Sequence, residues 1–168
     1  QHIYRLLDEG DLDAVAALEE PGISKPAAQY RELARSPIVC VCPAGHPLAA
    51  KSEVSPPDLR AFPLVLFALP HVPLPVAQLQ GALMEDRPLS DFYFCESAEA
   101  LSVLVQAGYG VSVLPELLAF ELRGLQKIPL AGAAPVSLGI YYKTLQGKPA
   151  LRDFLRCAKE CFSPEKQA

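Results

Sequence analysis

Short apolar runs that alternate with stretches of helical spacing are the feature that most restricts how this chain can fold. The strands that these runs predict cover residues 13–18, 38–42, 64–69, 92–96, 111–114 and 136–142, and residues 127–130 are a candidate for a further short strand. The helices predicted from apolar residues at helical spacing run from residue 1 to Gly10, from about Pro75 to Met84, over 97–107 and over 151–162. Strands that alternate with helices favour a largely parallel sheet with right-handed crossovers, and such sheets bind ligands at the carboxyl ends of their strands. The pattern therefore predicts an α/β fold with a binding site at those ends.

One such junction lies in the segment ESAEALSVLVQAGYG, residues 96–110. Ser97 stands where a strand ends and a helix begins, so it is predicted to cap the helix, and Gly108 is predicted to end it. A capped helix start also presents backbone amides, which attract anions. A small carboxylate is therefore the first ligand to try. Glu96 would repel it if its side chain faced the ligand, so either this side chain turns away or the effector also carries a donor such as an amine or a hydroxyl.

Composition limits the partners of the chain. Its 168 residues, 51% of them hydrophobic, can build one sizeable core or two small lobes that share a boundary. Lys and Arg number 15 against 19 Asp and Glu, and no basic cluster is present, so the chain by itself is predicted to bind nucleic acid poorly. No apolar run approaches the length of a membrane span, and the first residues do not resemble a secretory signal. A cytoplasmic location is therefore expected.

No motif in the sequence carries a specific catalytic chemistry. GVSVL at 110–114 resembles a serine nucleophile elbow, but leucine replaces the glycine that the sharp turn requires, so Ser112 is predicted to be an ordinary strand residue. GYG at 108–110 lacks the third glycine of a dinucleotide fingerprint and precedes a strand instead of following one. His46 precedes a proline and is predicted to stabilise a turn, whereas His71 is either a solvated loop residue or a ligand contact. No enzymatic activity and no cofactor are predicted.

The five cysteines include two closely spaced pairs. Cys40 and Cys42 would share one face of a strand, and Cys157 and Cys161 would share one face of a helix. Each pair could supply half of a metal site, but no histidine or acidic residue stands at a convincing spacing nearby. The cysteines are therefore predicted to be reduced thiols without a metal.

The order of four segments resembles the effector-binding domain of LysR-type transcriptional regulators. These segments are LLDEGDLDAVAAL, SPIVCVCPAGHPLA, VSPPDLRAFPLVLF and ESAEALSVLVQAGYGVSVLPELL, and together they cover most of residues 5–118. The resemblance implies a fold like that of type 2 periplasmic binding proteins, with two Rossmann-like α/β lobes joined by two crossing strands. Residues 1–43 would then hold part of lobe I and the first crossing strand, 44–130 lobe II, and 131–168 the return strand and the last helix of lobe I.

The same resemblance implies where a ligand would bind. Effectors of this family lie between the lobes, which points here to the last residues of three predicted strands and to the residues directly after them. These residues are Leu18, Ala68, Leu69, Pro70, His71, Glu96, Ser97 and Ala98.

Two segments of the family pattern are missing from this sequence, namely the winged helix-turn-helix and the first strand, first helix and second strand of lobe I. Lobe I is therefore expected to be incomplete, to have unpaired sheet edges and to promote self-association. DNA would be contacted only through a domain outside this sequence. The leading hypothesis is a non-enzymatic module that senses a small-molecule effector to adjust transcription. A solute-binding protein of a transporter and an enzyme of unknown type remain as alternatives.

Overall fold

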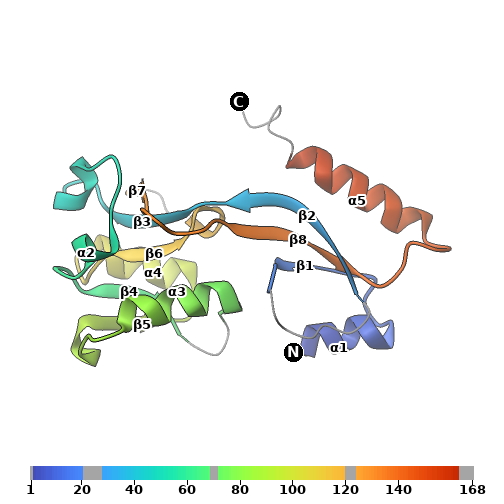
Figure 1. Cartoon of the computed structure of the whole chain (residues 1–168), viewed down its shortest axis with the longest axis horizontal. Helices are drawn as coiled ribbons and strands as arrows, with labels where there is room; N and C mark the ends of the chain where they lie inside the picture. Colours follow the sequence, from blue (N-terminus) through green and yellow to red (C-terminus); the bar gives the residue numbers. More distant parts are fainter. Residues whose placement is uncertain (1, 21–27, 69–71, 120–123, 163–168) are drawn as a thin grey trace. The chain divides into compact units, whose positions relative to one another are not determined.

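The chain folds into two compact units. The computed structural model describes residues 2–20, 28–68, 72–119 and 124–162 (Figure 1). Unit 1 comprises residues 1–35 and 137–168, and unit 2 comprises residues 36–136. The chain therefore passes from one unit to the other twice, after Arg35 and after Val136.

Unit 1 is a three-stranded sheet with a helix on each face. Its strands β1 (Ala14–Leu18), β8 (Val136–Tyr142) and β2 (Gln29–Ser36) lie in the order β1-β8-β2, and β1 runs antiparallel to β8. Successive side chains of a strand point to opposite faces of the sheet, and side chains of β8 are packed on both faces. Tyr141 packs against Leu7 of α1 (His2–Glu9), whereas its neighbours Ile140 and Tyr142 pack against α5 (Pro149–Cys161) on the other face. Figure 1 shows these two helices on opposite sides of the strands.

Strand β2 was not expected from the sequence, which predicted a charged loop leading up to residue 37. Its side chains, QYRELARS, are exposed or half-buried except for that of Ser36, so the segment has no continuous apolar run to mark a strand. The segment is held in the sheet by its place beside β8. The loop prediction was wrong because backbone pairing leaves no signature in a partly solvated sequence.

Unit 2 contains a mixed sheet and several helices. The elements are β3 (Ile38–Pro43), η1 (Pro47–Ala50), α2 (Pro56–Leu59), β4 (Leu64–Phe67), α3 (Leu74–Met84), η2 (Leu89–Asp91), β5 (Phe92–Cys95), α4 (Ala98–Gln106), β6 (Ser112–Pro115), η3 (Glu116–Ala119) and β7 (Leu125–Pro129). In the order β6-β3-β7 both strand pairs are antiparallel, whereas β4 and β5 are a parallel pair. An isolated bridge pairs Leu64 of β4 with Val111, the residue directly before β6.

The prediction of a largely parallel sheet was wrong for the centre of unit 2. There β3 runs antiparallel to both of its neighbours, because it is the strand by which the chain enters the unit and not the first strand of a crossover. A continuous apolar run such as Ile38–Cys42 reports burial on both faces of a sheet. Burial on both faces does not determine the direction of the strand.

The core of unit 2 fixes the position of α4. Leu101 and Val105 are fully buried in one cluster with Val39, Val41 and Val65, which come from β3 and β4. Burial of an aliphatic side chain of this size stabilises a fold by about 1.5–3 kcal/mol. The start of α4 is thereby held beside the carboxyl end of β5.

Candidate functional site

A cavity lies in unit 2 where β4 and β5 end and α4 begins. The two parallel strands finish side by side, and the amide of Ala68 donates a hydrogen bond of 2.8 Å to the carbonyl of Cys95. The cavity has a volume of about 270 Å³. Its lining residues are Phe67, Ala68, Val72, Pro73, Val76, Cys95, Glu96, Ser97, Ala98 and Leu118.

Four of the residues named from the sequence line this cavity, namely Ala68, Glu96, Ser97 and Ala98. Leu18 belongs to unit 1, where it is buried at the end of β1 and pairs with Leu138 of β8. The remaining three, Leu69, Pro70 and His71, lie outside the described residues. The structure therefore brings together the residues at the ends of two neighbouring strands.

The start of α4 confirms the cap predicted from the sequence. Ser97 has extended backbone angles, and its side-chain oxygen accepts a hydrogen bond of 3.2 Å from the amide of Ala100. Glu99 occupies the first turn, and the hydrogen bonds from its own backbone amide and from the Ser97 hydroxyl lower the pKa of its carboxyl group. The helix also ends where the sequence predicted, because Gly108 follows it with a φ of 81°.

The wall of the cavity is mostly apolar and was missed by the sequence analysis. Phe67 ends β4, Val76 lies in the first turn of α3, and Leu118 lies in η3. Apolar residues at these positions look like ordinary core residues in a sequence. The one signal that could have found Phe67 and Cys95 is their place directly before the predicted residues Ala68 and Glu96.

Cys95 contributes no reactive thiol to the cavity. Its side chain is buried, its sulfur donates a hydrogen bond of 3.4 Å to the carbonyl of Leu66, and burial raises the pKa of its thiol. A raised pKa keeps the thiol protonated and weakly nucleophilic. The residue therefore contributes apolar surface to the cavity.

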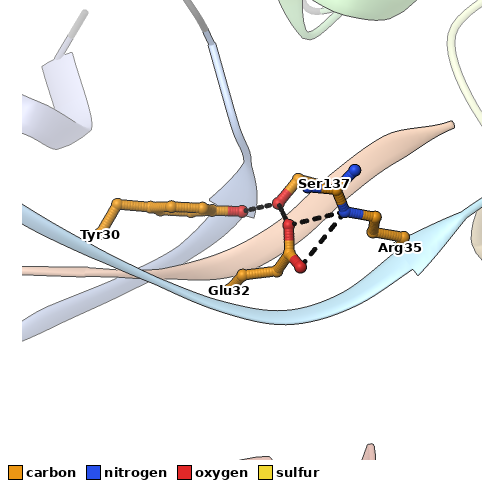
Figure 2. Close-up of polar contacts among 4 residues, drawn as sticks. All are labelled: Tyr30, Glu32, Arg35 and Ser137. Carbon is orange, nitrogen blue, oxygen red and sulfur yellow. Dashed lines mark hydrogen bonds and ion pairs between the residues drawn. The ribbon is translucent and has the colours of Figure 1, made fainter. Parts of the chain in front are cut away.

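A second group of polar side chains joins β2 to β8 in unit 1 (Figure 2). The Ser137 hydroxyl donates to a Glu32 carboxylate oxygen at 2.8 Å, so the Tyr30 hydroxyl, 2.8 Å from the same serine oxygen, is the donor of that pair. The Arg35 Nε donates to both Glu32 oxygens, at 3.1 and 3.3 Å. The Ser137 hydroxyl, followed by Arg35, lowers the pKa of Glu32, while burial is the main cause that raises the pKa of Tyr30 to about 12.

This polar group was missed because the sequence predicted a loop where β2 lies. Arg35 and Ser137 are also the last and first residues of unit 1 at its two chain crossings. The group thus ties the two strands together at the end from which the chain leaves the unit.

Residues considered for catalysis have structural roles here. Ser112 is buried, and its hydroxyl donates a hydrogen bond of 2.7 Å to the carbonyl of Val65, so it is an ordinary strand residue as predicted. The ring nitrogen Nδ1 of His46 accepts from the amide of Leu48 at 3.2 Å, and the ring packs on Phe62 with centroids 4.5 Å apart. The predicted turn role of His46 is therefore confirmed.

All five cysteines are free thiols, three of them buried and two exposed on α5. Within the described part of the chain, no three or more His, Cys, Asp or Glu side chains are grouped so that they could hold a metal ion. Over the same residues, none of the helices combines the length and the apolar character that a membrane crossing requires.

Comparison with known proteins identifies the family. The sequence profile described as the LysR substrate binding domain matches residues 1–163, so this chain belongs to that family. The family consists of transcription regulators and not of enzymes, and its fold is the two-lobed, periplasmic-binding-protein-like α/β fold. The family and the fold class predicted from the order of the sequence segments are thus confirmed.

Two regulators of Escherichia coli strain K12 are similar in sequence. The HTH-type transcriptional regulator YnfL is 29% identical over an alignment of 153 residues, and the match covers 88% of this chain and 50% of YnfL. The Hca operon transcriptional activator HcaR is 28% identical over an alignment of 165 residues, and the match covers 90% of this chain and 51% of HcaR. The chain therefore spans about half the length of the curated relatives that it matches.

A solved effector-binding domain has the same fold. The BenM effector binding domain with its effector benzoate superposes with a TM-score of 0.76 at 20% sequence identity. The match covers 99% of this chain and 77% of that domain. At this level of identity, the similarity establishes the fold and not the ligand.

Proposed function

We propose that this chain senses a small-molecule effector for a LysR-type transcription regulator, and that the effector binds in the cavity at the ends of β4 and β5. The cavity itself is the observation that carries the proposal, because it lies where parallel strands end, which is where α/β sheets bind ligands. Family membership supports a regulatory role. In the whole regulator, which acts in the cytoplasm, DNA is contacted through a domain other than this one.

The proposal is tested by filling the cavity. The full 168-residue chain, labelled with ¹⁵N, is titrated with benzylamine, benzyl alcohol and benzoate, and amide shifts are followed by NMR. We expect at least one compound to shift the amides of Ala68, Glu96 and Ala98. The variant Ala98→Phe should weaken that binding by about tenfold or more. The added ring occupies space in the cavity, so the ligand loses the apolar contacts that it would make there.

The matched control is Ala107→Phe, which makes the same change at the exposed end of α4, outside the cavity lining. It should bind as the unchanged chain does. The same loss of binding in both variants, or shifts confined to other residues, would contradict the proposed site.

We also propose that the chain associates with itself through the unit 1 sheet. Among the strands that the structure describes, β1 and β2 each have β8 as their only neighbour, and such free edges pair readily with another chain. The amide of Glu19 donates a hydrogen bond to the carbonyl of Ser137. In an antiparallel pair only every second residue directs its amide toward the partner strand. Ala16 is three residues before Glu19, so its amide points away from β8.

Sedimentation velocity over a range of concentrations should show dimers or larger species. Ala16→Pro removes an outward amide that the ladder to β8 does not use, so it should shift the chain toward the monomer by about tenfold in the dissociation constant. Ala16→Ser keeps that amide and should associate as the unchanged chain does. A monomer at every concentration would refute this proposal.

A further inference from the structure

The charge of the unit 2 cavity has one sign. Among the lining residues that the structure describes, Glu96 carries the only charged side chain, and no Lys, Arg or His is present. Glu96 is exposed, whereas the surrounding wall from Phe67, Val76 and Leu118 is apolar and at least half-buried. The described part of the cavity lining therefore combines a largely apolar surface with one carboxylate.

The start of α4, which would ordinarily attract an anion, is already engaged by groups of this chain. The amide of Ala100 donates to the Ser97 side chain, and the amide of Leu101 donates to the Ser97 carbonyl. The carboxylate of Glu99 lies at the same turn, where its own backbone amide and the Ser97 hydroxyl stabilise its charged form. A carboxylate ligand would find two negative side chains and few free donors at this place.

We propose, on the basis of the effector role proposed above, that the cavity takes a small amine. The apolar body of the ligand fills the space between Phe67, Val76 and Leu118, and its protonated amino group donates to the Glu96 carboxylate. A donor group of this kind is complementary to the carboxylate of Glu96, the one charged side chain among the described lining residues. The carboxylate considered from the sequence as a first ligand fits this arrangement less well.

Three probe compounds of similar size separate the possibilities. Benzylamine, benzyl alcohol and benzoate share one ring and carry a positive, a neutral and a negative group at neutral pH. Dissociation constants are measured from the amide shifts of Ala68 and Ala98 in the full chain, at low and high salt. We expect benzylamine to bind about tenfold tighter than benzoate, because like charges in one cavity repel.

Substitution of the carboxylate identifies its role. Glu96→Gln should weaken benzylamine binding by about fivefold, a modest effect because the side chain is exposed, and should leave benzyl alcohol unaffected. Glu85→Gln makes the same change in net charge at the end of α3, outside the cavity lining, and should change the binding of neither benzylamine nor benzyl alcohol. Both positions are exposed, so both variants should remain folded.

The outcomes distinguish failure of the amine proposal from failure of the proposed effector site. Benzoate binding in the cavity as tightly as benzylamine, or an equal loss in both glutamine variants, would overturn the amine proposal while leaving an effector site in place. If none of the three compounds shifted the cavity amides, the amine proposal and the proposed effector site would both be refuted.

Discussion

Replacing Gly110 by alanine is expected to lower the free energy of unfolding of the chain by about 3 kcal/mol or more, as overpacking against rigid atoms does. A Cβ atom at this position would lie 2.4 Å from the carbonyl oxygen of Pro63 and 2.8 Å from its carbonyl carbon. Both are backbone atoms, held in place because Val111 donates to that same oxygen at 3.0 Å. The clash can be relieved only by separating β4 from the segment that leads into β6.

The matched control is Gly81→Ala, because a Cβ there would meet no atom within 4 Å. Gly81 is an exposed position in the interior of α3, where alanine should raise the stability by about 1 kcal/mol. Urea denaturation followed by circular dichroism measures both variants. Equal stability of Gly110→Ala and the unchanged chain would mean that the contact with Pro63 is not tight in solution.

The features that the sequence predicted well are those set by local chemistry. Ser97 could be recognised as a cap, and Gly108 as a helix end, because each role depends on a few neighbouring residues. The buried strand at 38–42 followed from its unbroken apolar run. The family followed from the order of several weak segments, which is more specific than any one of them.

The features that it missed depend on which distant segments meet. The direction of β3 is set by where the chain enters unit 2, and the strand β2 is set by its neighbour β8. The role of Gly110 likewise rests on Pro63, which is far away in sequence. A glycine in GYG looks like a turn residue until its partner is known.

The candidate site shows the same division. The rule that ligands bind at the carboxyl ends of strands pointed to Glu96 and Ser97, and the family resemblance added Ala68 and Ala98. The apolar wall from α3 and η3 could not be located, because residues such as Val76 and Leu118 have the composition of core residues. Sequence therefore located the polar side of the cavity and not the surface that would select the body of a ligand.

Gly139→Ala is expected to have an effect of similar size in unit 1, about 3 kcal/mol of lost stability. A Cβ atom there would lie 2.4 Å from Cζ of Tyr30 and 2.5 Å from the carbonyl oxygen of Arg31. The tyrosine ring thus lies directly over the glycine. The same ring packs on Tyr141 at 4.6 Å and donates to Ser137, so moving it also breaks the polar group that joins β2 to β8 (Figure 2).

The displaced ring gives this prediction a second measurement. Burial is the main cause that raises the pKa of Tyr30 to about 12, so exposure of the ring in a Gly139→Ala variant that remains folded should return that pKa toward its ordinary value near 10. In the unchanged chain the phenol favours the folded state below about pH 10, and this contribution is lost as the pH rises toward 12. Ultraviolet titration of tyrosinate should therefore show one more tyrosine ionising near pH 10 in the variant than in the unchanged chain.

A double variant separates the two clashes at Gly139. Removing the ring by Tyr30→Ala relieves the contact with Cζ but leaves the backbone oxygen of Arg31 at 2.5 Å from the new Cβ. Adding Gly139→Ala to Tyr30→Ala should therefore still lower the stability, though by less than in the unchanged chain. If the second substitution cost nothing once the ring was gone, the ring alone would determine the need for glycine. If it cost the same in both backgrounds, the backbone of β2 would be the determining contact.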